Sequence, residues 1–480
     1  MSKRIMIVRA LASLLVVGLS AGCQKATPPT GRNPATLATS AALWLTTPDK
    51  SVLFQLQPAL AWSAAAPSSG ASVIEVDDKQ TFQTIDGFGY CLTGGSAQLL
   101  HAMSPAARQA LLRELFGTEG NHIGVSYLRV SIGASDLDAK VFSYDDLPAG
   151  QTDPTLAKFS LAPDRAALIP VLKEILAISP SLKLLGSPWS PPPWMKTNGA
   201  SKGGSLKPEF YDAYARYFVK YLRGMQAEGI RLDAITVQNE PLHPGNNPSL
   251  LMLAEQQAEF VKKHLGPALR TAGLDTKIIV YDHNADRPDY PLTILKDPEA
   301  SAFVDGSAFH LYAGDISALT AVHDAFPTKN VYFTEQWTGG PGTFGPDLGW
   351  HVQNLLIGAT RNWSRNVLEW NLAANPLYEP HTPGGCTTCL GAITLDRDAV
   401  TRNSAYYSIA HGAKFVRPGS VRIASSGPVS LPNVAFKTPA GQTVLVVLNP
   451  ASSAQALAIR HRGRVLNSQL AGGAVGTFVW

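Results

Sequence analysis

The chain has 480 residues, too many for one ordinary hydrophobic core, so we expect two domains or one large domain with an addition. With 45% hydrophobic and 16% charged residues, it has the composition of a well-buried globular protein with fewer charges than usual. The formal net charge is only +4, and three of the basic residues lie in a segment that we expect to be removed. The composition therefore gives no electrostatic footprint for nucleic acid.

The N-terminal segment has the features of an export signal. Two basic residues precede an apolar run over residues 10–19, which is too short to span a membrane. The run ends in Leu-Ser-Ala-Gly-Cys, which resembles a bacterial lipobox with Cys23 as the lipidated residue. We predict a signal peptide over residues 1–22 and a lipid-anchored linker, rich in Pro, Thr, Ala and Ser, over residues 23–42. The expected location is the bacterial cell envelope, with the lipid anchor in a membrane; simple secretion is the alternative.

The other cysteines predict a local disulfide. Cys386 and Cys389 form a C-x-x-C pair, but no second pair and no paired histidines lie nearby to complete a zinc site. In an exported protein a disulfide that pins a loop is the expected use of this pair. Cys91 is then left as a small buried side chain. We expect no metal and no cofactor.

Strands and helices alternate along most of the chain. Two short strands, over residues 51–56 and 72–76, come first and belong to an N-terminal segment of residues 43–79. Eight apolar runs then predict strands over residues 83–90, 127–133, 182–189, 234–241, 277–282, 307–312, 330–335 and 366–371. Helices are predicted between them, the clearest over residues 104–117, 207–229, 249–273 and 401–416. The count and the alternation predict a (β/α)₈ barrel over residues 80–417.

The pattern changes after Pro418. Residues 418–480 contain only short apolar or alternating runs between turns, which is typical of an all-β segment. Together with the early strands, this segment predicts a β-sandwich side domain built from both ends of the chain. We expect it to pack against the barrel and to take no part in catalysis.

In a parallel barrel, polar residues at the carboxyl ends of the strands share one mouth. Glu240 follows the fourth strand, which must stop at Pro241 because proline cannot donate to a sheet. Glu335 ends the seventh strand, nearly opposite in the predicted barrel. The strand ends also carry Arg129, Trp189, Asn239, His310, Tyr312 and Trp370.

This inventory suits glycoside hydrolysis, in which one carboxyl donates a proton and the other attacks the anomeric carbon. Arg129 and Tyr312 are expected to keep Glu335 anionic. Glu240 is then expected to start protonated, because a neighbouring anion and a dry pocket disfavour its charge. Asn239 beside it is placed to hold the sugar 2-hydroxyl.

Each residue also has a purely structural reading. Either glutamate could be a salt-bridged loop residue, Arg129 could be a structural ion-pair partner, and Trp189 could pack a proline-rich loop. Asp136, Asp282 and Glu369 are rival carboxylates whose default is a hydrogen-bonded or solvated role. The joint occurrence of these residues at strand ends is what favours catalysis.

The chain resembles glycoside hydrolase family 30, the glucosylceramidase-like retaining enzymes. The resemblance rests on segments 85–89, 127–136, 186–199, 236–241, 308–312, 333–335 and 369–373. It implies a (β/α)₈ barrel with a side β-sandwich, Glu240 as acid/base and Glu335 as nucleophile. It also implies that Asp136, Trp189, Asn239 and Trp370 hold the sugar at the cleaved bond, and that Arg129, His310 and Tyr312 surround the nucleophile.

The substrate is less well defined by the resemblance. The loop over residues 378–390, with its C-x-x-C, differs from the animal glucosylceramidases, and Tyr90-Cys91 replaces small residues. The Asp136 and Trp189 pattern favours β-glucosyl substrates, a carbohydrate or a glycolipid, cleaved in the manner of a glucosylceramidase or β-glucosidase. The alternatives are an endo-β-1,6-glucanase, a β-xylosidase or xylanase, a transglycosylase, and a non-catalytic sugar-binding lipoprotein.

Overall fold

The computed structural model describes residues 38–480. The predicted signal peptide, Cys23 and the linker up to residue 37 lie outside the described residues. Within residues 38–480, no helix is both long and apolar enough to cross a membrane.

Eight parallel strands close into a barrel in the order β5 to β12, with β12 paired to β5, which confirms the predicted fold. The strands are β5 (Gly87–Leu92), β6 (Tyr127–Ile132), β7 (Lys183–Pro188), β8 (Ala234–Thr236), β9 (Lys277–Ala285), β10 (Val304–Gly314), β11 (Asn330–Glu335) and β12 (Ser364–Asn371). They read as nearly continuous apolar runs because parallel strands are buried on both faces.

The barrel interior is filled by side chains. One cluster takes a buried residue from each of seven barrel strands: Tyr127, Leu185, Ala234, Ile279, Ala308, Tyr332 and Leu368. The barrel is therefore a packed core with no channel at this level, and chemistry is confined to its mouth.

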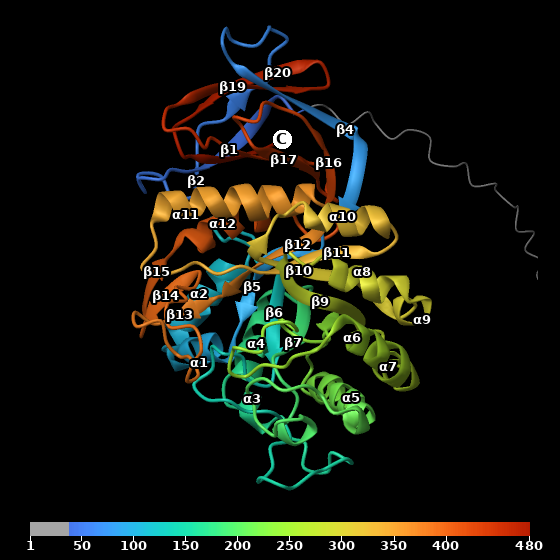
Figure 1. The fold of residues 1–480 in the computed structure, drawn as a ribbon. Coiled ribbons are helices and arrows are strands. Elements are labelled where there is room, and N and C mark those ends of the chain that lie inside the picture. The colour runs from blue at the N-terminus through green and yellow to red at the C-terminus, as the bar shows by residue number, and fades with distance from the viewer. Residues whose placement is uncertain (1–37) are drawn as a thin grey trace, which may run out of the picture. The chain divides into compact units, whose positions relative to one another are not determined.

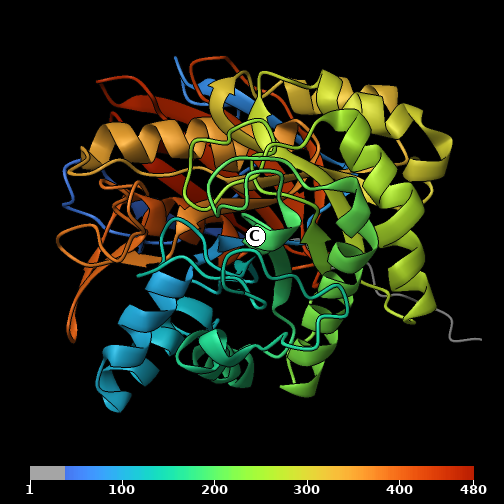
Figure 2. The ribbon, with the colours of Figure 1, turned by 60° about the horizontal axis from the view of Figure 1, so that its bottom comes forward.

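The helices lie outside the barrel strands (Figure 2). They are α1 (Gly94–Ala102), α2 (Pro105–Phe116), α3 (Ala162–Arg165), α4 (Leu168–Ile178), α5 (Tyr211–Ala227), α6 (Ala254–Phe260), α7 (Gly266–Thr271), α8 (Asp289–Lys296), α9 (Pro298–Ser301), α10 (Ala318–Ala325), α11 (Phe344–His351) and α12 (Ser404–Ala413). Helix α2 begins as predicted, because the Ser104 side chain accepts from the backbone N–H of Ala107 and Pro105 needs no partner. The helix predicted over residues 249–273 consists of α6, a π-helical turn over Val261–Leu265, and α7.

A second sheet joins the two ends of the described chain. The N-terminal strands β1 (Ser40–Thr46) and β4 (Ser72–Thr84) lie among the C-terminal strands in Figure 1. The other members are β2 (Gln55–Leu56), β3 (Leu60–Ala61), β16 (Val421–Ser425), β17 (Asn433–Lys437), β18 (Thr443–Leu448), β19 (Gln455–His461), β20 (Arg464–Leu470) and β21 (Val475–Val479).

Two predicted boundaries need correction. Strand β1 begins at Ser40, so residues 40–42, expected in the linker, belong to the sheet, where they are held by pairing with β21 and β3. Strand β4 continues to Thr84, past the boundary expected at residue 79, because its second half pairs with β16. In both cases the partner is distant in sequence, and local composition does not announce it.

Strand β18 shows how the sandwich is attached to the barrel. Its residues Val444, Val446 and Leu448 belong to the large barrel core, whereas Leu445 and Val447 belong to the core of the sandwich. Alternate side chains of a strand point to opposite faces, so this strand is buried on both sides. The sandwich is thus a packed neighbour of the barrel.

The strand that carries Asn239 and Glu240 is shorter than expected. It ends at Thr236, and residues 237–240 form an irregular tip fixed by neighbouring strands. The backbone N–H of Asn239 donates to Pro188, and that of Glu240 donates to Asp282. Glu240 has φ of 44°, a left-handed conformation that is uncommon for a residue with a side chain. Such strain is often found at functional sites.

Candidate active site

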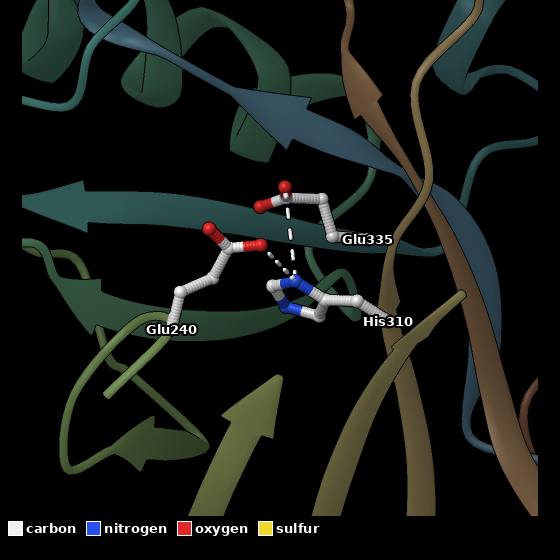
Figure 3. Close-up of side chains that lie close together, drawn as sticks. All are labelled: Glu240, His310 and Glu335. Carbon is white, nitrogen blue, oxygen red and sulfur yellow. Dashed lines mark hydrogen bonds and ion pairs between the residues drawn. The ribbon is translucent and has the colours of Figure 1, made fainter. Parts of the chain in front are cut away.

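Glu240 and Glu335 lie together at the barrel mouth, and the ring of His310 lies beside both carboxylates (Figure 3). Both glutamates are buried, with 8% and 5% of their surface exposed. An oxygen of Glu240, an oxygen of Glu335 and a nitrogen of His310 all lie within 4.8 Å of one another. One oxygen of each carboxyl therefore lies close to the other group, which agrees with a retaining glycosidase, whose carboxyl groups are roughly 5–5.5 Å apart, better than with an inverting one, at roughly 6.5–9.5 Å.

Arg129 organises the floor of the site. It is fully buried on β6, and its Nη1 donates to Oε2 of Glu335 at 2.5 Å. Its Nη2 donates to Asn239 at 2.6 Å and to Asp282 at 2.8 Å, and its Nε donates to Ser187 at 3.0 Å. One guanidinium thus fixes the nucleophile candidate and the residue beside the acid candidate.

Asp282 is the residue whose importance the sequence did not reveal. Its Oδ2 accepts from Arg129, Thr236 and Ser187, and its Oδ1 accepts from Thr334 and lies 3.1 Å from Nε2 of His310. Burial alone would raise its pKa, but the charge of Arg129 holds the pKa well below its usual range. Asp282 is therefore a permanent buried anion beneath the two glutamates.

His310 links that anion to the reacting groups. Its Nδ1 lies 3.1 Å from Oε1 of Glu240 and 3.8 Å from Oε1 of Glu335. Burial would lower the pKa of His310, but the charge of Glu335 and the hydrogen bonds to Asp282 and Glu240 raise it to about 9. The imidazole is therefore protonated at neutral pH.

This proton changes the expected charge distribution. Burial would raise the pKa of Glu240, yet the hydrogen bond and the charge of His310 lower it. Burial raises the pKa of Glu335 against the opposing charges of His310 and Arg129. The proton available to Glu240 thus belongs to the His310–Glu240 pair, whereas sequence reasoning placed it on Glu240 alone. The pKa of Glu335 also differs from the expectation, because burial outweighs the lowering effect of Arg129.

Glu335 is held from a second side by Tyr312. The phenol Oη donates to Oε1 of Glu335 at 2.9 Å, while Arg129 takes the other carboxylate oxygen. Both oxygens are therefore oriented, which fixes the carboxylate for attack on a carbon in the pocket.

Two tryptophans form an aromatic surface against this floor. The rings of Trp189 and Trp370 have centroids 5.4 Å apart, and Arg129 lies 4.8 Å from the centroid of Trp189. Both rings line the pocket, which suits contact with the apolar face of a sugar.

Asp136 lies at the same mouth, held by the loop that contains the C-x-x-C pair. The backbone N–H of Cys386 donates to Oδ2 of Asp136 at 3.3 Å, and Cys386 is joined to Cys389 by a disulfide. Burial and the charge of Glu335 raise the pKa of Asp136 to about 7. Cys91 is buried and is the free cysteine of the described residues.

The pocket has a volume of about 340 Å³. Of the residues predicted for the site, it is lined by Asp136, Trp189, Glu240, Tyr312, Glu335 and Trp370, and the predicted disulfide pair, Cys386 and Cys389, lines it as well. Arg129, Asn239 and His310 lie beneath as buried supports. Asn239 accepts a hydrogen bond from Arg129 through Oδ1. The rival carboxylate Glu369 is buried away from the pocket, with an oxygen 2.6 Å from His351.

Sequence reasoning missed five other residues that line the pocket: His243, Asn246, His283, Asn284 and Trp337. They come from segments that follow β8, β11 and the tip of β9. The rule that strand ends face the mouth could have found His283 and Asn284, which directly follow Asp282.

The three clustered side chains could also present ligand atoms to a cation. However, Oε2 of Glu335 already accepts from Arg129, and the charged imidazole of His310 faces both glutamates. The site is therefore organised around its own cations, and its chemistry is that of an oriented carboxylate beside a proton donor.

Comparison with known proteins agrees with this geometry. Residues 85–416 match the glycosyl hydrolase family 30 TIM-barrel domain, and residues 419–478 match the family 30 beta sandwich domain. An endo-1,6-beta-D-glucanase of Neurospora crassa is 39% identical over 358 residues, which cover 72% of this chain and 73% of that protein. The lysosomal acid glucosylceramidase of Mus musculus is 31% identical over 438 residues, 85% of this chain and 83% of that protein. The solved structure of an endo-β1,6-glucanase has a TM-score of 0.85 and 34% identity, covering 92% of this chain and 99% of its own.

Proposed function

The chain belongs to glycosyl hydrolase family 30, and on that premise we propose that it is a retaining endo-β-1,6-glucanase. The observation that carries the chemistry is the buried pair of Glu240 and Glu335, within 4.8 Å through their nearest ligand atoms. The observation that favours the linkage is the similarity to endo-β-1,6-glucanases, at 39% and 34% identity, above the 31% to the mouse glucosylceramidase. The relatives thus favour the alternative substrate over the glucosylceramidase-like reading that sequence reasoning ranked first.

In this proposal Glu335 is the nucleophile. Its carboxylate oxygen forms a bond to the anomeric carbon while the bond from that carbon to the glycosidic oxygen breaks. Arg129 and Tyr312 orient the two oxygens, so the carboxylate needs little rearrangement to attack. The product of this step is a covalent glycosyl-enzyme.

Glu240 is the acid/base. It transfers a proton to the leaving oxygen, and the proton reaches it across the 3.1 Å contact with Nδ1 of His310. In the second step Glu240 takes a proton from water, whose oxygen attacks the anomeric carbon and releases Glu335. Two displacements at one carbon return the original β-configuration.

The remaining mouth residues bind the sugar at the cleaved bond. Trp189 and Trp370 supply an apolar surface, and Asp136, which lines the same pocket, is a hydroxyl ligand. Asn239 is oriented by Arg129 for a contact with the 2-hydroxyl, a contact that strengthens in the transition state.

The proposal is tested with a panel of linear β-1,6-glucan, glucosylceramide and β-1,4-xylan, with Glu335→Gln as the inactive control. We expect new reducing ends from the β-1,6-glucan, with a spread of oligosaccharides as an endo enzyme gives. NMR of the first product should show the β-anomer. A clear preference for glucosylceramide or xylan would overturn the linkage, and an α-anomer would overturn the retaining mechanism.

A further inference from the structure

The pocket has a polar wall beside Glu240. His283 and Asn284 lie in the last residues of β9, next to β8, and both side chains line the pocket. The tryptophans and Asp136, which we assign to the sugar at the cleaved bond, come from other strands and their loops. Because Glu240 protonates the leaving oxygen in the proposed function, the β8 and β9 side is where the leaving group must lie.

His283 has unused hydrogen-bonding capacity. Only 7% of its surface is exposed, and among residues 38–480 its buried Nδ1 has no hydrogen-bond partner. A buried polar atom without a partner is destabilising, so a ligand in the pocket that forms a hydrogen bond with this nitrogen would gain free energy. Burial lowers the pKa of His283 to about 4, so the ring is neutral at neutral pH and offers one donor and one acceptor.

Asn284 is fixed through its amide oxygen, and among residues 38–480 its amide Nδ2 donates no hydrogen bond. Its Oδ1 accepts from the backbone N–H of Tyr312 at 3.0 Å, and its backbone carbonyl accepts from the Tyr281 hydroxyl at 2.5 Å. With Oδ1 taken, the Nδ2 group is the end of the amide that remains for a ligand. Its orientation is set by a backbone contact and does not depend on the ligand.

These two side chains match the chemistry of a sugar. A hydroxyl group both donates and accepts, as a neutral imidazole requires, and an oxygen accepts from the amide of Asn284. The hydrocarbon chains of a lipid leaving group could form a hydrogen bond with neither side chain. The wall therefore favours a leaving group that carries several hydroxyls.

We propose that His283 and Asn284 form the leaving-group subsite and bind hydroxyl groups of the sugar released in the first step. This inference rests on the proposed function, which places the acid/base at Glu240. The two residues set specificity for the leaving group and do not touch the reacting carbon. They therefore act on a sugar leaving group and leave an aryl leaving group largely unaffected.

The first test compares two leaving groups in the same variants. His283→Phe keeps a ring to pack against Tyr281 and removes both nitrogens, while Asn284→Asp keeps Oδ1 for Tyr312 and removes the amide donor. We expect kcat/KM for a β-1,6-linked glucose oligosaccharide to fall about tenfold in each, and kcat/KM for a 4-nitrophenyl β-glucoside to change less than about twofold. His323→Phe, on α10 and stacked on Trp363, is the matched histidine control and should change neither.

An equal fall with both substrates would overturn the inference, because it would place the residues at the reaction centre. Unchanged kinetics with both substrates would overturn it as well. Thermal unfolding of each variant separates a folding defect from a binding defect.

A second test does not depend on the linkage. With 4-nitrophenyl β-glucoside as donor, glucose or methanol can replace water in the second step. The acceptor oxygen bonds to the anomeric carbon, the bond to Glu335 breaks, and the acceptor proton passes to Glu240. We expect His283→Phe to reduce transfer to glucose about tenfold and to leave transfer to methanol unchanged. Equal losses would contradict the subsite, whereas a wild-type enzyme that ignores β-1,6-glucan yet shows this difference would contradict only the proposed linkage.

Discussion

His310 contacts Glu240 through Nδ1 and Oε1, 3.1 Å apart, and uses its other nitrogen on the buried anion Asp282, also at 3.1 Å. Because Asp282 stays ionised, it favours the protonated imidazole, and that proton faces Glu240. The candidate acid therefore does not stand alone. It is one end of a chain of three buried groups, Glu240, His310 and Asp282. The charge of Arg129 keeps Asp282 ionised, and Asp282 in turn favours the charged form of His310.

The first prediction concerns the pH profile of this chain. His310 has its pKa raised to about 9, so the pair loses its proton as the pH rises through that value. His310→Gln should remove an inflection near pH 9 from the profile of kcat/KM against pH, because glutamine does not titrate. Asp282→Asn should instead move the inflection to lower pH, since loss of the anion disfavours the imidazolium. A profile unchanged in both variants would show that the titration of His310 does not limit the reaction.

The same pKa predicts the pH dependence of stability. The folded pKa of His310 lies above the ordinary value of 6.5, so its contribution to stability is complete below about pH 6.5 and is lost as the pH rises through about 9. Urea unfolding of the wild type should therefore show decreasing stability over this interval. The decrease should be smaller in His310→Gln, and an equal decrease in both proteins would argue against the raised pKa.

The activities of variants at the two glutamates should depend differently on the leaving group. Glu335→Gln should abolish turnover of every substrate, because no nucleophile remains. Glu240→Gln should lose most activity on a sugar leaving group and retain it on a 2,4-dinitrophenyl β-glucoside, which departs without a proton. Steady-state rates with both leaving groups measure the difference. If Glu335→Gln showed the rescue and Glu240→Gln did not, the two roles would be exchanged.

Arg129 should matter for stability as well as for activity. It is the cation shared by Asp282 and Glu335, and all three are buried. Arg129→Met removes the guanidinium from two buried anions, which then keep only hydrogen bonds and the charge of His310. This loss should destabilise the fold by about 3–5 kcal/mol in urea unfolding. Arg165→Met is the control: it breaks an ion pair with Glu228 in which Arg165 is 57% exposed, and such pairs contribute at most about 1 kcal/mol. Similar losses in the two variants would count against the buried cluster.

The sequence predicts the barrel and both glutamates because buried parallel strands give continuous apolar runs and their ends meet at one mouth. It does not predict the role of Asp282. Tyr281 and Asp282 have φ of 73° and 65°, which form a left-handed turn within β9. A Tyr-Asp pair in the sequence does not predict such a turn.

Strand β1 was missed for a different reason. It lies next to a segment rich in Pro, Ala and Thr, and its stability comes from pairing with β21 at the other end of the chain. Likewise, the contact between Asp136 and Cys386 joins two loops far apart in sequence. Contacts between residues far apart in sequence thus determine where strands begin and end and how side chains are charged, which local sequence patterns do not predict.

We expect reduction of the Cys386–Cys389 disulfide to weaken substrate binding. Its loop is bonded on one side to Asp136, through Cys386 and Thr382, and on the other to the segment after β11, through a bridge between Gly339 and Cys389. The double variant Cys386→Ser with Cys389→Ser should raise KM several-fold with little change in kcat, because Asp136 loses its fixed donor. Treatment of the wild type with dithiothreitol should do the same, and Cys91→Ala should remain sensitive to the reagent. An effect on kcat alone would contradict a positioning role.

At Asp136, we expect a substitution that stabilises the fold to weaken activity on the sugar. Burial and the charge of Glu335 raise its pKa from 3.8 to about 7, so between these values the folded state holds a proton that the unfolded state releases. Stability therefore falls as the pH rises from about 4 to 7, and ionised Asp136 destabilises the fold by up to about 4 kcal/mol above that range. Asp136→Asn cannot ionise, so it should be more stable than the wild type, and its advantage should grow by about 2 kcal/mol between pH 5 and pH 8. Its kcat/KM should nevertheless fall, because the carboxyl group that binds the sugar hydroxyl is gone. Asp275→Asn, at an exposed position, should show no such growth with pH; a pH-independent difference for Asp136→Asn would contradict the raised pKa.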